Sequence, residues 1–187
     1  MPRISPISNS SDATVTEVLD NMKARMGKAP NAMATLAQSS AAFNGYHALK
    51  KALMRGRLTS RQREIVALVT AQQNACQYCL SGHAQAAAAV GLTDSDILNA
   101  RTGKSDNRLD NAVANFAMKV LQHRGLVDDV DLVVAREDGI DDSLMVEIVA
   151  NVALNTLTNY NNRLAGTEID FPVVPLELEA FSNQSSG

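Results

Sequence analysis

The sequence lacks the marks of several classes of protein. It has no apolar run near the roughly 18 residues that a membrane-spanning helix needs, and its N-terminus has no apolar segment of the kind found in secretory signals. The formal net charge of −3 leaves no basic excess for binding a nucleic-acid backbone. We therefore expect a protein of the cytoplasm that binds neither membranes nor nucleic acid.

Proline is missing from the whole middle of the chain. All five prolines lie before Asn31 or after Phe171. Because proline breaks helix interiors, the stretch between them is free to form long helices, and strand-type alternation of apolar and polar residues is absent as well. We predict an all-α fold with one helical domain over residues 16–169, an extended N-terminal arm (1–15) and an extended C-terminal tail (170–187).

Capping residues and apolar periodicity place the helices. Thr59 with Gln62 resembles a capping box and opens a helix that ends near Gln73, and Thr93 with Asp96 opens a shorter one. The other predicted helices span residues 16–26, 32–54, 74–90 with Asn74 as the cap, 106–123, a segment capped by Asp129, and a segment from Asp141 to about Leu164.

Two segments of the chain share a pattern. Residues 60–79 can be laid on residues 143–162 at a constant offset of 83 positions, with serine, glutamate, isoleucine, valine and alanine in matching places. The two cysteines of the first segment then fall on Asn159 and Asn162. Either the fold contains a duplicated helical unit with the chemistry in its first copy, or two buried helices share a common alanine and valine pattern.

Cysteine is scarce, and its two copies lie three positions apart in the stretch NACQYCLSGH. On a helix capped by Asn74, Cys76 lies in the first turn, where the helix dipole favours a thiolate. Cys79 then lies one turn later, within the Cα separation of a disulfide, and His83 can reach its sulfur. Three interpretations remain open: a redox dithiol, a metal site that also uses Glu64, or a chance cluster in a helical core.

Glu64 is an acidic residue inside the apolar stretch EIVALV. Burying an unpaired carboxylate is costly, and the nearest predicted partner is His83 on the adjoining helix. A Glu64–His83 pair could pass protons to and from Cys79, much as the third group of a catalytic triad orients its base. The alternative is a surface carboxylate paired with Arg61 or Lys51.

The pattern Glu64-x11-Cys76-x2-Cys79-x3-His83 resembles the alkylhydroperoxidase D-like members of the carboxymuconolactone decarboxylase family, and the similarity extends over roughly residues 25–175. The resemblance implies an all-helical trimer or hexamer, in which the C-terminal tail could pack on a neighbouring subunit. It also implies a peroxidase in which Cys79 attacks the peroxide and Cys76 donates a proton and resolves the sulfenic acid. His83 and Glu64 would relay protons.

Tyr78 stands where the best-known alkylhydroperoxidases carry a histidine between the cysteines. A phenol titrates near ~10 and does not act as a base at neutral pH. We expect Tyr78 and Leu80 to line the approach to the thiols. Decarboxylating members of the family lack the cysteine pair, so the predicted activity is cofactor-free hydroperoxide reduction in antioxidant defence, with electrons from a thioredoxin-like or lipoylated partner. The alternative is a non-catalytic helical oligomer that binds a small ligand or metal at the Cys/His site.

Overall fold

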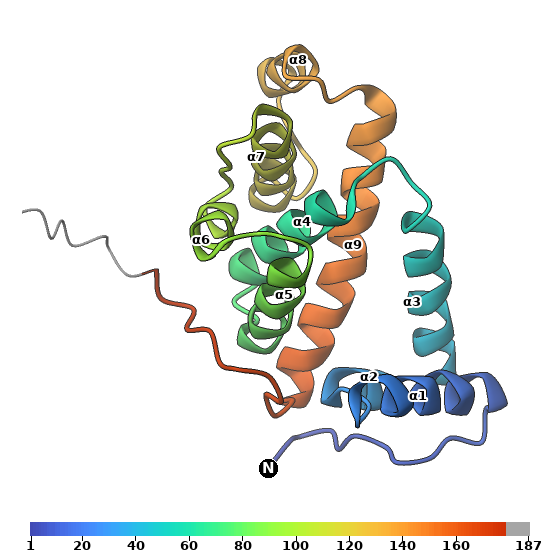
Figure 1. Cartoon of the computed structure of the whole chain (residues 1–187). Helices are drawn as coiled ribbons and strands as arrows, with labels where there is room; N and C mark the ends of the chain where they lie inside the picture. The colour runs from blue at the N-terminus through green and yellow to red at the C-terminus, as the bar shows by residue number, and fades with distance from the viewer. Residues whose placement is uncertain (179–187) are drawn as a thin grey trace, which may run out of the picture.

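The computed structural model describes residues 1–178, and in that part of the chain it contains helices and no strand (Figure 1). In chain order the helices are α1 (Ala13–Met26), α2 (Asn31–Leu36), α3 (Ser40–Leu53), α4 (Ser60–Gln73), α5 (Gln77–Ala89), α6 (Asp94–Arg101), α7 (Arg108–Gln122), α8 (Asp129–Glu137) and α9 (Asp142–Ala165). The all-α prediction is confirmed.

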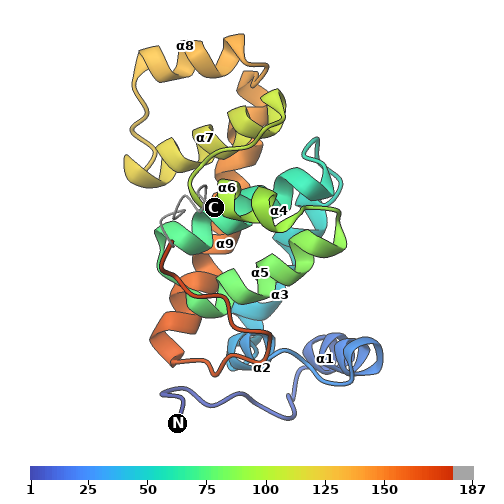
Figure 2. The same ribbon diagram turned by 60° about the vertical axis from the view of Figure 1, so that its left-hand side comes forward.

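Helix α4 lies at the centre of the molecule, where it packs against α5, α6, α7 and the long helix α9 (Figures 1 and 2). Every residue from Ile65 to Ala71 is buried. A helix that is covered on all sides carries apolar residues all round, which explains why the stretch EIVALV shows no amphipathic stripe. Glu64 lies one position before this buried stretch.

The first three helices form a smaller apolar cluster of their own, built on Val15, Leu19 and Phe43. The single helix predicted for residues 32–54 is wrong, because the chain breaks between α2 and α3. Ser39 accounts for the break: its hydroxyl accepts a hydrogen bond from Ala42 N and caps the new helix α3.

The junction of α4 and α5 also differs from the prediction. The capping box of Thr59 is present, and α4 ends at Gln73 as predicted. Asn74, however, is the C-cap of α4 and not the N-cap of α5, because its side chain turns to α9 and donates to Asn159 Oδ1 over 3.1 Å. Ala75 takes a positive φ of 49°, and Cys76 becomes the N-cap of α5. The predicted cap of α8 is also wrong: the N-cap is Asp128, one residue before the predicted Asp129.

Both ends of the described chain pack on its helices. The N-terminal arm bonds to Ala165 and Ala34 through the amides of Arg3 and Ile7, and α1 begins at Ala13, three residues before the predicted boundary. The segment 167–178, which we call the strap, lies against α5 and α6 of its own chain: Ser81 Oγ accepts from Val174 N, and the Arg101 guanidinium donates to Pro175 O. The contact of the tail with a neighbouring subunit stays a prediction. The rest of the predicted tail, residues 179–187, lies outside the described part of the chain.

Candidate active site

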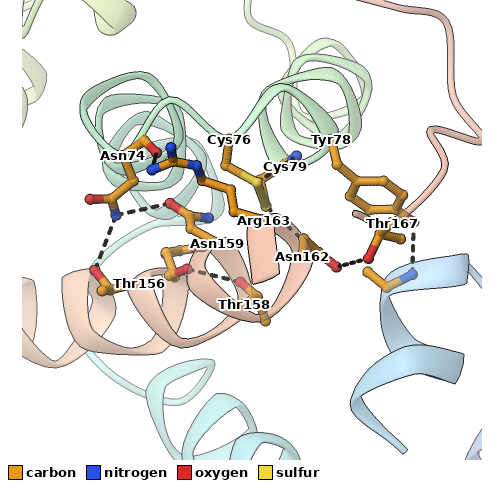
Figure 3. The surroundings of a disulfide bond; sticks show 12 residues. Asn74, Cys76, Tyr78, Cys79, Thr156, Thr158, Asn159, Asn162, Arg163 and Thr167 are labelled. Atoms are coloured by element: carbon orange, nitrogen blue, oxygen red, sulfur yellow. Dashed lines mark hydrogen bonds between the residues drawn. A yellow bond between two sulfur atoms is a disulfide. The ribbon is translucent and has the colours of Figure 1, made fainter. Parts of the chain in front are cut away.

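The two cysteines lie at the start of α5 and are joined by a disulfide bond (Figure 3). Their Cα atoms are 5.3 Å apart, inside the range that a disulfide accommodates. Both side chains are buried, Cys79 with 5% of its surface exposed and Cys76 with 1%. Cys76 Sγ also accepts a hydrogen bond from Cys79 N over 3.3 Å, as the cap of the helix. The fold therefore holds the pair within bonding distance and away from bulk water.

An asparagine that was not among the predicted site residues contacts the disulfide. Asn162 on α9 donates from Nδ2 to Cys79 Sγ over 3.3 Å, and its Oδ1 accepts from the hydroxyl of Thr167 over 3.0 Å (Figure 3). Asn162 is 4% exposed. The one signal in the sequence was the 83-residue offset, which aligns Cys79 with Asn162.

A second asparagine of α9 lies on the same buried face. Asn159 has no exposed surface, and its Oδ1 accepts from Asn74 Nδ2 in the α4–α5 junction. Its own Nδ2 has no hydrogen-bond partner among the residues that the structure describes. The face of α9 that lies toward the disulfide is therefore polar although it is buried.

Glu64 and His83 form the pair predicted from the sequence. The distance from His83 Nδ1 to Glu64 Oε2 is 2.8 Å, and both side chains are partly buried. Burial alone would raise the pKa of the Glu64 carboxyl, but the charge and hydrogen bond of His83 outweigh it and Lys50 and Arg63 add to the effect, so the pKa is lowered. An ionised carboxylate only accepts hydrogen bonds. Nδ1 therefore carries the bonded proton and Nε2 is left to exchange protons.

The alternative partner Arg61 is engaged elsewhere. Its guanidinium bonds to Asp110 Oδ2 over 2.8 Å and to Asp96 Oδ1 over 3.0 Å. This leaves His83 as the ion-pair partner of Glu64 in the described structure.

His83 and Glu64 also form one wall of a cleft of about 70 Å³ between α3, α4, α5 and α9. Neither cysteine lines it. The lining residues are Tyr46, Lys50, Leu53, Met54, Arg63, Glu64, Ala67, His83, Asn151, Leu154 and Asn155. The histidine thus faces a hollow on the surface and lies one helical turn after Cys79 on α5.

The model of the carboxymuconolactone decarboxylase family matches residues 26–123, more than half of the 187 residues and the whole of the Glu64–His83 region. The chain belongs to the carboxymuconolactone decarboxylase family. A search of curated proteins found no match.

Solved structures show the same fold as this member of the family. The alkylhydroperoxidase AhpD core from Ralstonia eutropha JMP134, a peroxidase-related protein, is 24% identical with a TM-score of 0.78, covering 89% of this chain and 93% of its own. A peroxidase-related protein from Silicibacter sp. TM1040 is 19% identical with a TM-score of 0.73, covering 88% and 91%. A cysteine-to-alanine variant of the debrominase Bmp8 in complex with 2,3,4-tribromopyrrole is 18% identical with a TM-score of 0.73, covering 89% and 91%.

Tyr78 and Leu80 make structural contacts, and neither lines the cleft between α3, α4, α5 and α9. Their place beside the approach to the thiols stays a prediction. Leu80 has no exposed surface and lies in the main core. The Tyr78 hydroxyl donates to Asp170 Oδ1 over 2.7 Å and accepts from Ala32 N over 3.1 Å. Burial and the neighbouring Asp170 carboxylate raise the pKa of this phenol, although the Ala32 bond opposes them. Tyr78 is a clamp between α2, α5 and the strap, and its phenol stays protonated at neutral pH.

The strap covers the outer side of the cysteine-bearing helix. The ring of Phe171 meets Tyr78 edge-on, with 5.5 Å between ring centroids. A Cβ atom at Gly82 would lie 3.1 Å from the Phe171 ring, so the glycine of LSGH permits the strap to approach α5. Packing against Phe171 therefore explains the glycine of this motif, for which the sequence alone gave no reason.

Within residues 1–178, no three His, Cys, Asp or Glu side chains come together as a metal ion would require. In the same range, no helix is both long enough and apolar enough to cross a membrane.

Proposed function

We propose that this protein is a thiol-dependent peroxidase that reduces alkyl hydroperoxides with Cys76 and Cys79. The observation that carries the proposal is the pairing of a buried, bonded Cys-x-x-Cys with an ion-paired Glu64 and His83 one helical turn away. A dithiol that stores two electrons and a base that moves protons are the two parts that peroxide reduction needs. Membership of the family and the peroxidase-related fold neighbours support the same class of reaction.

The first step oxidises Cys79. Its thiolate attacks the terminal oxygen of the hydroperoxide, the O–O bond breaks, and the alkoxide leaves with the bonding electrons. The alkoxide takes a proton through His83 and departs as an alcohol, while Cys79 becomes a sulfenic acid. The Glu64 carboxylate holds the Nδ1 proton, so that the proton released comes from Nε2.

The second step forms the disulfide. The Cys76 thiolate attacks Cys79 Sγ, the S–O bond breaks, and hydroxide leaves with a proton as water. A thioredoxin-like or lipoylated dithiol then returns two electrons by thiol–disulfide exchange. A cycle that depends on such a reductant fits the cytoplasm, which is the compartment that we propose.

A thiol count tests the proposal. Reduced protein is freed of reductant and given one equivalent of cumene hydroperoxide, and its thiols are titrated before and after. We expect the two thiols of the chain to disappear together, with a loss of two hydrogens by mass spectrometry. Unchanged thiols would instead support the alternative, a non-catalytic helical oligomer that binds a small ligand or metal at the Cys/His site.

Single-cysteine variants test the assignment of roles. Cys79→Ser should abolish peroxide consumption, whereas Cys76→Ser should keep one round of oxidation and leave a sulfenic acid on Cys79 that a dimedone-type probe labels. Labelling of Cys76 in Cys79→Ser protein, with none of Cys79 in the converse variant, would reverse the assignment.

We also propose that the chain assembles into a homo-oligomer through α9. The outer face of this 24-residue helix carries exposed apolar residues at spacings of three and four positions. They are Val146, Val149, Ala153, Leu157, Tyr160 and Leu164, and we call them the α9 stripe. Such spacing forms one continuous seam on a helix.

The α9 stripe is suited to a second copy of itself. If two α9 helices run antiparallel about a two-fold axis between Ala153 and Leu157, each leucine lies opposite the small alanine of the partner helix. Val146 then lies opposite Leu164 and Val149 opposite Tyr160. An isologous contact needs such a self-complementary surface. Of the trimer and hexamer that the family resemblance implies, a two-fold contact fits the hexamer.

A further inference from the structure

Asn162 is the one side chain that donates a hydrogen bond to a cysteine sulfur in the described structure. A disulfide or thiolate sulfur is an acceptor, so the amide must present its NH₂ group to Cys79 and not its oxygen. The oxygen is satisfied from the other side, because the Thr167 hydroxyl donates to it over 3.0 Å. The two contacts fix the orientation of the amide.

The backbone holds Thr167 in place for this contact. Gly166 ends α9 with a φ of 60°, a left-handed conformation that suits glycine. The chain turns back over the last turn of the helix, and Thr167 N donates to Asn162 O over 3.1 Å. Thr167 therefore bonds to Asn162 twice, through its amide and through its hydroxyl.

The burial of this contact adds to its strength. Asn162 is 4% exposed and Cys79 is 5% exposed, and electrostatic hydrogen bonds are stronger where water is excluded. Asn159 lies three residues earlier on the same face with an N–H group that has no partner within residues 1–178. Buried donors without an acceptor are uncommon and call for a physical explanation. The helix thus presents the amide donor of Asn162 to a sulfur on which negative charge develops on reduction.

We propose that Asn162 is a catalytic residue whose amide N–H stabilises the Cys79 thiolate, and that Thr167 positions it. The proposal rests on the proposed function, because it assigns Asn162 to the attacking sulfur of that reaction. Hydrogen bonds to the charged form of a group favour that form. In the first step the hydrogen bond from Asn162 Nδ2 keeps Cys79 ionised before attack. This hydrogen bond weakens as the sulfur gains its bond to oxygen and loses its charge.

The test is the pH dependence of alkylation with Cys79 as the sole thiol. In the Cys76→Ser background, full-length protein reacts with iodoacetamide across a pH series. Asn162→Leu, which has no donor, should raise the midpoint by about one to two pH units, the size of one hydrogen bond to a charged group. Asn162→Asp should raise it further, because a carboxylate repels the thiolate.

The matched control is Asn161→Leu. Asn161 is the preceding residue of α9, is partly buried and makes no side-chain hydrogen bond within the described residues, so the midpoint should stay unchanged. Thr167→Val keeps the Asn162 amide but frees its oxygen, and it should give a smaller upward shift. If Asn162→Leu does not fold, Thr167→Val takes its place as the test variant. Equal midpoints in folded Asn162→Leu and Cys76→Ser protein, or in Thr167→Val where only that variant folds, would overturn the proposal.

A second readout uses both cysteines. A donor that favours the thiolate favours the reduced dithiol, so Asn162→Leu should shift the equilibrium with dithiothreitol toward the disulfide by about tenfold. A purely structural role for Asn162 predicts lower stability but no such directed shift. Neither measurement uses a peroxide. A wild-type protein that fails to consume hydroperoxide would therefore refute the proposed function without deciding the role of Asn162.

Discussion

At the scale of single residues, the contact between Glu64 and His83 decides which nitrogen of the imidazole is available. The lowered pKa of Glu64 keeps the carboxylate charged, and its bond to Nδ1 directs exchange to Nε2. The same histidine forms a wall of the cleft between α3, α4, α5 and α9. The Glu64 carboxylate thus orients an imidazole at the surface of a cleft, which is more than a packing role.

Glu64→Gln is expected to slow the chemistry and keep the fold. The amide is isosteric but carries no charge, so the charged partner of His83 Nδ1 is lost and Cys79 loses part of its activation. Peroxide turnover should fall by ~10²-fold or more, the scale of a positioned proton-transfer group, and the pH at which Cys79 is alkylated should rise. An unchanged pH profile in well-folded protein would show that Glu64 takes no part in a relay.

The same residue makes a prediction about stability. The pKa of Glu64 is lower in the folded protein than the ordinary value of 4.5, so its ion pair stabilises the fold above that pH and the contribution is lost as pH falls through the folded-state value. Wild-type protein should therefore melt at a higher temperature than Glu64→Gln at about pH 6, and the gap should narrow at a pH well below 4.5. Calorimetry at both pH values measures this. A gap that persists at the lower pH would point to packing instead of charge.

At the scale of secondary-structure elements, the strap and α5 depend on each other. Gly82 leaves room for Phe171, and Ser81 accepts the Val174 amide. A larger side chain at Gly82 would push the ring away, at a cost of roughly 1–3 kcal/mol for overpacking.

Gly82→Leu is therefore expected to release the strap. Hydrogen exchange should show that the Val174 amide loses its protection, and the free energy of unfolding should fall. Gly45→Leu is the matched control, because Gly45 also lies inside a helix but a Cβ atom added there would meet no heavy atom within 4 Å. Retained protection at Val174 in Gly82→Leu would mean that the strap does not depend on this contact.

The elements also show what the sequence could predict. The capping boxes at Thr59 and Thr93 are local signals, and the helices that they open begin where expected. The prediction for Asn74 is wrong because its side chain bonds to Asn159, 85 residues away, and a capping rule considers only neighbours. Asn162 escapes prediction for the same reason: its partner Cys79 is 83 residues away and comes within reach only when α9 packs against α5. The pairing of Glu64 with His83 is predictable because an adjoining hairpin brings them together.

At the scale of the whole molecule, α9 carries two different sets of side chains on opposite faces. Its buried face carries Asn159 and Asn162, of which Asn162 donates to Cys79 Sγ, while its outer face carries the α9 stripe. Tyr160 is 59% exposed and Leu164 is 62% exposed. A continuous apolar seam of this length is a sign of an interaction surface.

Because the faces are separate, assembly and chemistry should be separable by substitution. Leu157→Glu places a charge near the centre of the proposed two-fold contact, where each copy would bring its carboxylate close to the other. Light scattering should give an even multiple of the 20.0 kDa chain mass for wild-type protein and half of that mass for the variant, while the disulfide still forms. Val130→Glu, at an exposed valine of α8 outside the stripe, should leave the mass unchanged. A wild-type mass of 20.0 kDa at micromolar concentration would refute the assembly, and an oligomer that survives Leu157→Glu would place the contact elsewhere.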